Sequence, residues 1–175
     1  GETAGAAIGR HPDIDVVSFT GSTEVGGYFL KYSSESNLKP VGLEMGGKSP
    51  MIILEDAAIT DDLVSNAVSA AFWNGGQNCS ANMRQIVDRK VKDEFMGKVL
   101  ERAASLKLGD PLDPATDMGS MVTREHRDRV MSYIGKGRTE GAKLLAGGDA
   151  PKKLGGYFVA PTVFASFYAS YRDIF

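Results

Sequence analysis

The chain has 175 residues, of which 42% are hydrophobic and 24% are charged, close to the averages for globular domains. Its 20 basic and 22 acidic residues give a net charge of −2, which excludes the basic footprint of a nucleic-acid or membrane-surface protein, so we expect neither partner. No apolar run approaches the ~20 residues that a membrane-spanning helix needs.

Cys79 is the only cysteine, so the chain cannot form an internal disulfide. A lone thiol is typical of a reducing compartment, and we expect a cytoplasmic protein. The chain starts at Gly1 without Met and without a secretory signal, and it ends directly after the apolar and charged run Tyr171–Phe175. We therefore expect a piece of a longer protein, with a processed mature chain as the alternative.

Expected strands and helices alternate along the chain. Short runs rich in β-branched and apolar residues predict strands at Val16–Phe19, Val41–Glu44, Pro50–Leu54, Gln85–Asp88, Ala142–Ala146 and Tyr157–Phe164. Apolar residues at helical spacing predict helices near Glu24–Lys31, Ile59–Trp73, Val91–Leu106 and Arg124–Glu140, and the opening of the chain is also helix-like. This order predicts an α/β fold, with a mostly parallel sheet between helices in αβα layers.

The first expected strand is followed by a glycine turn and a helix. Ser22 or Thr23 is predicted to cap the helix, with Glu24 in its first turn. Such a turn presents backbone N–H groups and the positive end of the helix dipole to a phosphate. The segment departs from G-x-G-x-x-G because Thr23 replaces the second glycine, so an ordinary capped turn remains an alternative.

Residues Gly42–Ser49 match the phosphate-loop pattern G-x-x-x-x-G-K-[ST]. That pattern needs a helix to begin at the Lys-Ser pair, but here Pro50 follows and the next residues predict a buried strand. The loop would also bring Glu44 close to anionic phosphates, which is unfavourable. The sequence therefore argues against a nucleoside triphosphatase.

The lone thiol lies in the polar segment Phe72–Ala81, where a helix is predicted to stop at Gly75–Gly76. A structural cysteine usually lies in an apolar stretch. Cys79 is instead flanked by Asn78 and Ser80, which predicts an accessible thiol with backbone N–H groups nearby. A passive loop cysteine remains the alternative.

Together these segments resemble the aldehyde dehydrogenase superfamily. Phe19–Gly26 is similar to its cofactor-phosphate turn, and Leu43–Pro50 to its glutamate signature, with Met45 where Leu is common. Gly76–Cys79 is similar to its cysteine signature, and the three motifs follow the order of the family. Further similar segments are Leu108–Pro111, Met118–Gly119, Glu140–Lys143 and Pro161–Val163.

The resemblance implies NAD- or NADP-dependent oxidation of a small aldehyde to a carboxylic acid. Cys79 would attack the carbonyl to give a thiohemiacetal, and loss of hydride to the nicotinamide would leave a thioester. Glu44 would deprotonate the water that hydrolyses this thioester. The backbone N–H of Cys79 would form part of the oxyanion hole, and no metal site is implied.

The same resemblance implies where the cofactor binds. Gly21 and Ser22 would contact the pyrophosphate, Val25 would pack beside the adenine, and Met45 would lie near the nicotinamide through its backbone.

The terminal residues Arg172–Phe175 resemble the segment that holds the nicotinamide ribose and ring, which assigns Asp173 and Phe175 to the cofactor site. Asp173 is one methylene shorter than the Glu that is usual there. His126 falls near a position that can touch the same ribose, and a polar surface residue is the alternative.

By this resemblance, residues 1–42 are the end of a dinucleotide-binding domain and residues 43–175 a truncated catalytic domain, so the aldehyde dehydrogenase-like fold is incomplete. The parent enzyme would be a homodimer or homotetramer. We expect the isolated chain to be inactive, because the oxyanion asparagine and half of the cofactor site would lie upstream. The alternatives are a catalytically silent protein and a cofactor-free esterase that uses Cys79 and Glu44.

Overall fold

The computed structural model describes residues 1–151 and 153–165. The chain divides into two compact units, Gly1–Lys48 and Ser49–Phe175, which are described in turn. The expected assignment of residues 1–42 and 43–175 to two functional domains stays a prediction. Among the described residues, no helix is both long and apolar enough to cross a membrane.

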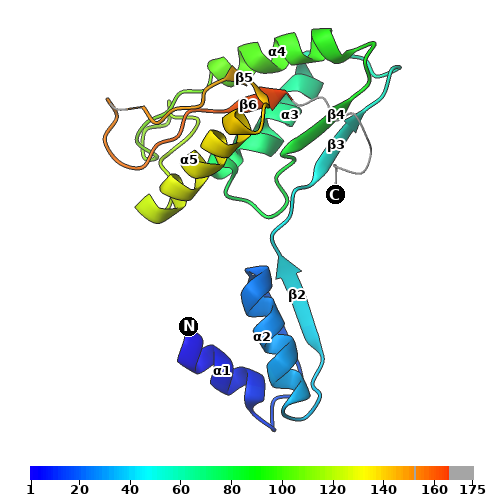
Figure 1. Ribbon diagram of the computed structural model, residues 1–175, viewed down its shortest axis with the longest axis vertical. Helices are drawn as coiled ribbons and strands as arrows, with labels where there is room; N and C mark the ends of the chain where they lie inside the picture. Colours follow the sequence, from blue (N-terminus) through cyan, green and yellow to red (C-terminus); the bar gives the residue numbers. More distant parts are fainter. Residues whose placement is uncertain (152, 166–175) are drawn as a thin grey trace. The chain divides into compact units, whose positions relative to one another are not determined.

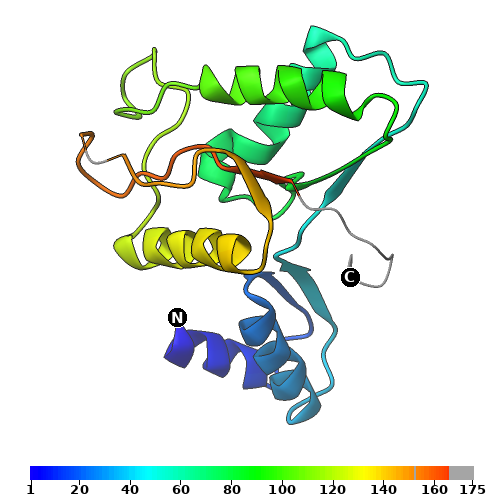
Figure 2. The ribbon, with the colours of Figure 1, turned by 45° about the horizontal axis from the view of Figure 1, so that its top comes forward.

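The first unit packs two helices and a two-stranded parallel sheet. Its elements are α1 (Glu2–Arg10), β1 (Val17–Gly21), α2 (Thr23–Ser34) and β2 (Val41–Met45) (Figure 1). α2 lies next to α1 and to both strands (Figure 2), with the rings of Phe19 and Phe29 4.9 Å apart. Gly26 lets α2 approach the sheet, since a Cβ there would lie 2.7 Å from Sδ of Met45.

A buried lysine connects the end of α1 to the start of β2. Lys39 is only 4% exposed, and its Nζ donates to the carbonyl of Gly9 at 2.8 Å and to Oγ of Ser36 at 2.9 Å. The hydroxyl of Ser33 donates to the Lys39 carbonyl at 2.6 Å. A buried charge is tolerated only when it is hydrogen-bonded, and a cation is favourable near a helix C-terminus, so this cluster stabilises the connection.

The second unit contains the remaining elements. They are β3 (Pro50–Ile53), α3 (Asp61–Phe72), the 3₁₀ turn η1 (Trp73–Gly76), β4 (Arg84–Val87), α4 (Lys92–Ala104), α5 (Arg124–Thr139), β5 (Lys143–Ala146) and β6 (Val163–Ala165). β3 pairs with β4 in parallel, whereas β5 and β6 are antiparallel.

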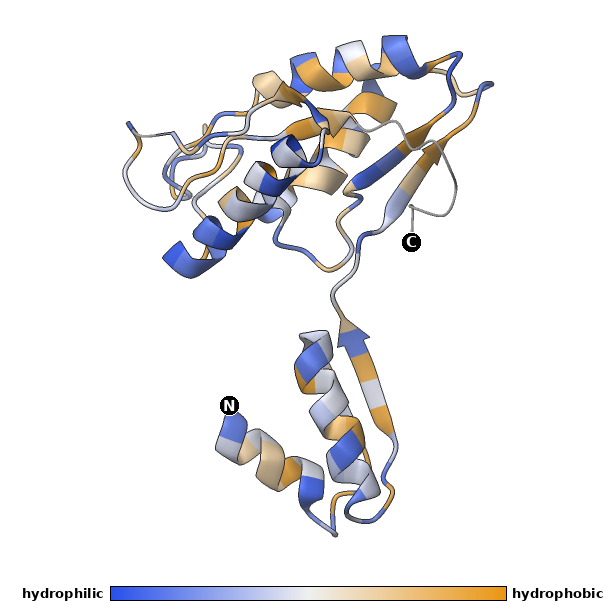
Figure 3. Cartoon of the chain, in the orientation of Figure 1, coloured by the Kyte–Doolittle hydropathy of each residue, from blue (hydrophilic) through white to orange (hydrophobic). Residues whose placement is uncertain are grey.

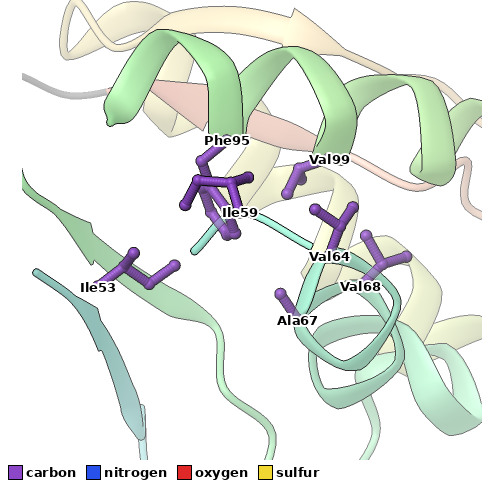
Figure 4. Packing of buried hydrophobic residues seen from close by; sticks show 7 residues of the cluster. All are labelled: Ile53, Ile59, Val64, Ala67, Val68, Phe95 and Val99. Atoms are coloured by element: carbon purple, nitrogen blue, oxygen red, sulfur yellow. The ribbon is translucent and has the colours of Figure 1, made fainter. Parts of the chain in front are cut away.

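The main core of this unit lies where α3 and α4 pack on one face of the β3–β4 pair. Hydrophobic and hydrophilic segments alternate along α4 (Figure 3), and its residues Phe95 and Val99 are buried on one side. Figure 4 shows the cluster that they join, whose members are Ile53, Ile59, Val64, Ala67, Val68, Phe95 and Val99. Burial of each large side chain stabilises the fold by about 1.5–3 kcal/mol.

The expected α/β class is confirmed, with corrections in detail. α3 begins at Asp61 rather than Ile59, because the Thr60 hydroxyl caps it by accepting from the N–H of Leu63 at 3.2 Å. Ser22 caps α2 as expected, accepting from the N–H of Val25 at 3.3 Å.

The expected strand at Tyr157–Phe164 is wrong for most of its length, since strand pairing covers only Val163–Ala165. The Tyr157 carbonyl accepts from Met121, and the Ala160 N–H donates to Asp149, so these groups bond to loops instead of a neighbouring strand. Pro161 offers no N–H for a ladder.

Candidate active site

Glu44 lies near the C-terminal end of β2, on the face of the sheet opposite α2. Side chains alternate along a strand, and Leu43 and Met45 are half-buried on the face that meets Gly26 of α2. Glu44 is exposed on the other face, where the parallel register places it beside Thr20 of β1. The sequence alone does not identify Thr20 as a neighbour of Glu44, because that pairing depends on the register of the two strands.

The expected phosphate turn has the predicted local structure. β1 ends at Gly21, Ser22 is the N-cap, and α2 begins at Thr23. Gly21, Ser22 and Val25 are all exposed. The first N–H groups of a helix lack partners within the helix, so this turn is chemically suited to an anion. The cofactor contacts of these three residues and of Met45 stay predictions.

The phosphate-loop pattern at Gly42–Ser49 lacks the structure that its chemistry requires. β2 ends at Met45, and the next element is the strand β3, which begins at Pro50. No helix begins at Lys48–Ser49. The structure therefore excludes the phosphate-loop arrangement at this segment, as the sequence indicated.

Cys79 follows a tight left-handed turn at the end of α3. Asn74, Gly75 and Gly76 have φ values of 54°, 65° and 74°. The backbone N–H and the side-chain Nε2 of Gln77 both donate to the Asn74 carbonyl, at 3.2 and 2.9 Å. In return, Nδ2 of Asn74 donates to the Gln77 carbonyl at 3.3 Å. These bonds close the turn just before Cys79.

The chain is fixed again directly after Cys79. Ala81 is 3% exposed, and the N–H of Asn82 donates to the Ala70 carbonyl at 3.1 Å. Cys79 itself is exposed, with Sγ 3.8 Å from Oδ1 of Asn78. The expected accessibility of the thiol is thus confirmed, while its catalytic role stays a prediction.

Gly76 is a site where a side chain should be destabilising. An L-residue at φ 74° costs roughly 1–2 kcal/mol, and a Cβ there would lie 3.2 Å from the Ala71 carbonyl oxygen. Gly76→Ala should therefore lower the free energy of unfolding by at least about 1 kcal/mol. Gly97→Ala, at an exposed position in α4 with open space around it, should instead raise it by about 0.5–1 kcal/mol.

Urea unfolding of the two variants measures both changes. Equal shifts of the same sign would contradict the account of the turn, because the two substitutions add the same methyl group and differ only in backbone conformation and surroundings.

The other expected cofactor residues are placed differently. Asp173 and Phe175 lie outside the described residues. His126 is half-buried in the first turn of α5, where its backbone N–H donates to the N-cap hydroxyl of Thr123 at 3.1 Å. Hydrogen bonds from its own backbone and from Thr123 hold the pKa of the neighbouring Glu125 below its usual value. These contacts define a capped helix start and leave the ribose contact of His126 a prediction.

One polar contact of the cysteine loop could not be foreseen from the sequence. Oε1 of Gln77 accepts from the backbone N–H of Val122 at 3.0 Å, across 45 positions of the chain. In the sequence Gln77 is marked only by the motif around Cys79, and local patterns carry no signal for a contact of this range.

Comparisons with known proteins agree with the motif resemblance. The aldehyde dehydrogenase family matches residues 1–172. Aminoacetaldehyde dehydrogenase of Pseudomonas aeruginosa is 43% identical over 163 residues, which are 93% of this chain and 32% of that protein. Human aldehyde dehydrogenase 1A1 is 47% identical over 166 residues, 95% of this chain and 33% of that protein.

A solved structure is similar over nearly the same range. Indole-3-acetaldehyde dehydrogenase of P. syringae, in complex with NAD⁺, has a TM-score of 0.91 and 42% identity, over 98% of this chain and 35% of that one. The chain thus spans about a third of the length of the relatives that it matches.

Proposed function

This chain belongs to the aldehyde dehydrogenase family, and from that premise we propose that the full-length protein containing it oxidises an aldehyde to a carboxylic acid. The observation that carries the proposal is the exposed thiol of Cys79, held between two fixed points of its loop within the motif Gly76–Cys79. A thiol that is accessible and held in place is suited to nucleophilic attack on a carbonyl.

The proposed chemistry proceeds through a covalent bond to Cys79. Its thiolate attacks the aldehyde carbonyl, and its backbone N–H donates to the oxyanion of the resulting thiohemiacetal. The substrate carbon then loses hydride and becomes a thioester. Glu44 accepts a proton from a water molecule that attacks this thioester, the carbon–sulfur bond breaks, and the carboxylic acid leaves with the thiol restored.

NAD or NADP supplies the hydride acceptor when bound. The turn at Gly21–Ser22 fits a pyrophosphate, because Gly21 brings no side chain and the N-terminus of α2 follows. Val25 would pack against the adenine, and Met45 would lie beside the nicotinamide through its backbone. Asp173 and Phe175 complete the proposed cofactor site. The NAD⁺ complex of the indole-3-acetaldehyde dehydrogenase supports this choice of cofactor.

We also propose the domain organisation, oligomeric state, location and substrate class of the full-length enzyme. Residues 1–42 would belong to its dinucleotide-binding domain and residues 43–175 to its catalytic domain. We propose a homodimer or homotetramer located in the cytoplasm, and a small aldehyde as its substrate.

The 175 residues alone should not reduce NAD in the presence of an aldehyde. The chain spans about a third of its relatives, so the isolated piece would lack much of the cofactor and substrate sites. The test compares NADH formation by the full-length protein and by this segment at equal concentration. Turnover by the segment would contradict the expectation, and inactivity of both with a range of aldehydes would overturn the proposed function.

A further inference from the structure

The side chain of Gln77 joins the Cys79 loop to a distant segment of the chain. Its Oε1 accepts from the N–H of Val122 at 3.0 Å, and its Nε2 donates to the carbonyl of Asn74 at 2.9 Å. Both ends of one half-buried amide are therefore engaged at once. We propose that Gln77 is a positioning residue that holds the backbone of Cys79 in the geometry for attack, an inference that rests on the function proposed above.

Val122 is a suitable anchor because the residues on both sides of it are fixed. Met121 is 5% exposed in a second hydrophobic cluster, and its N–H donates to the Tyr157 carbonyl at 2.9 Å. Thr123 is the N-cap of α5. The N–H of Val122, which donates to Gln77, thus lies between the core residue Met121 and the helix cap Thr123.

The turn before Cys79 needs such an anchor. Asn74 is a non-glycine residue in the left-handed conformation, with φ 54°, and surrounding contacts must maintain that conformation. On one side of Cys79, the side chain of Gln77 holds the loop through its hydrogen bond with Val122. On the other side, the loop is held by the burial of Ala81. Removing the amide leaves one end of the loop without its link to Val122, and Cys79 can then shift relative to the substrate.

We expect removal of the Gln77 amide to lower the catalytic rate more than the stability of the fold. Val122 is 75% exposed, so water can replace the lost partner of its N–H. A displacement of about 1 Å at a reacting group can lower the rate by about 10²-fold. Both the thiol and the oxyanion-binding N–H of Cys79 move with this backbone, so every reaction that begins with attack by Cys79 is affected alike.

The test uses the full-length enzyme with two substitutions at Gln77. Gln77→Met keeps the length of the side chain and removes both hydrogen bonds. Gln77→Glu keeps an oxygen toward Val122 but cannot donate to the Asn74 carbonyl. The matched control is Gln85→Met, which removes another side-chain amide. Gln85 lies on β4, and its Nε2 donates to the carbonyl of Ala67 in α3 at 3.3 Å.

Two rates are measured for each variant: aldehyde oxidation with NAD, and hydrolysis of p-nitrophenyl acetate without it. In the second reaction Cys79 takes the acetyl group, p-nitrophenolate leaves, and water hydrolyses the thioester. Gln77→Met should lower kcat for both reactions together by about 10–10²-fold, with Gln77→Glu intermediate and KM for NAD unchanged. Gln85→Met should leave kcat unchanged.

Wild-type kcat in both Gln77 variants, alongside an inactive Cys79→Ala, would overturn this inference and leave the proposed function intact. Equal losses in Gln77→Met and Gln85→Met would also overturn it, because they would indicate general loss of structure. If Gln77→Met does not fold, Gln77→Glu decides alone: lowered kcat with unchanged KM supports the inference, and wild-type kcat overturns it. A wild-type enzyme that oxidises no aldehyde would overturn both proposals.

Discussion

Replacing Cys79 with Ala in the full-length enzyme should lower aldehyde oxidation by at least about 10⁴-fold. Without the sulfur no thiohemiacetal forms, and the substrate carbon cannot reach the tetrahedral state from which hydride leaves. Cys79 is exposed in its loop, and within residues 1–151 and 153–165 its thiol has one hydrogen-bond contact, with Oδ1 of Asn78 at 3.8 Å. Its removal should therefore leave the fold intact. Steady-state formation of NADH measures the effect.

Ser80→Ala is the matched control for this loop. It removes the neighbouring hydroxyl, which donates to Oδ1 of Asn78 at 3.3 Å, and we expect it to retain most of the activity. Activity in Cys79→Ala near that of the wild type would remove Cys79 from the mechanism. Full retention of ester hydrolysis in the same variant would show that a different residue attacks the ester.

Replacing Glu44 with Gln should lower steady-state turnover by about 10²–10⁴-fold, the usual contribution of a general base. Gln has the same shape but cannot accept the proton of the attacking water. The first turnover should survive, because attack by Cys79 and loss of hydride precede the step that needs the base. We therefore expect a rapid burst of NADH, close to one equivalent per site, followed by a slow phase.

Glu35→Gln supplies the control on the same unit. Glu35 is an exposed carboxylate paired with Arg10 at 3.5 Å, and such surface pairs contribute little. It should show wild-type turnover. Loss of the burst itself in Glu44→Gln would assign Glu44 to an earlier step, and unchanged turnover would exclude it as the base.

Local physical chemistry made much of the architecture predictable. The β-branched run near Val17, the glycine turn and the capping side chain of Ser22 specify strand, turn and helix within neighbouring residues. Pro50 and the apolar residues after it indicated that a strand follows Lys48, and β3 begins there. These signals act over a few positions, so a single sequence contains them.

The remaining features depend on contacts between distant residues. The backbone near Tyr157 and Ala160 bonds to loops rather than to a strand. Pro161 weakens the prediction of a strand there, but the sequence does not identify the loops that supply the partners. The bond from Val122 to Gln77 spans 45 positions and has no periodicity. Thr20 beside Glu44 depends on the register of two strands. Side chains that position a site are recognised only when the fold brings their partners together.

In the proposed reaction Cys79 carries the covalent intermediate. The most direct measurement is an acid quench of the full-length Glu44→Gln enzyme during its NADH burst, followed by peptide mass analysis. We expect the mass of the substrate's acyl group on the peptide that contains Cys79. NADH formed while Cys79 remains unmodified, or the acyl group on another residue, would contradict the account.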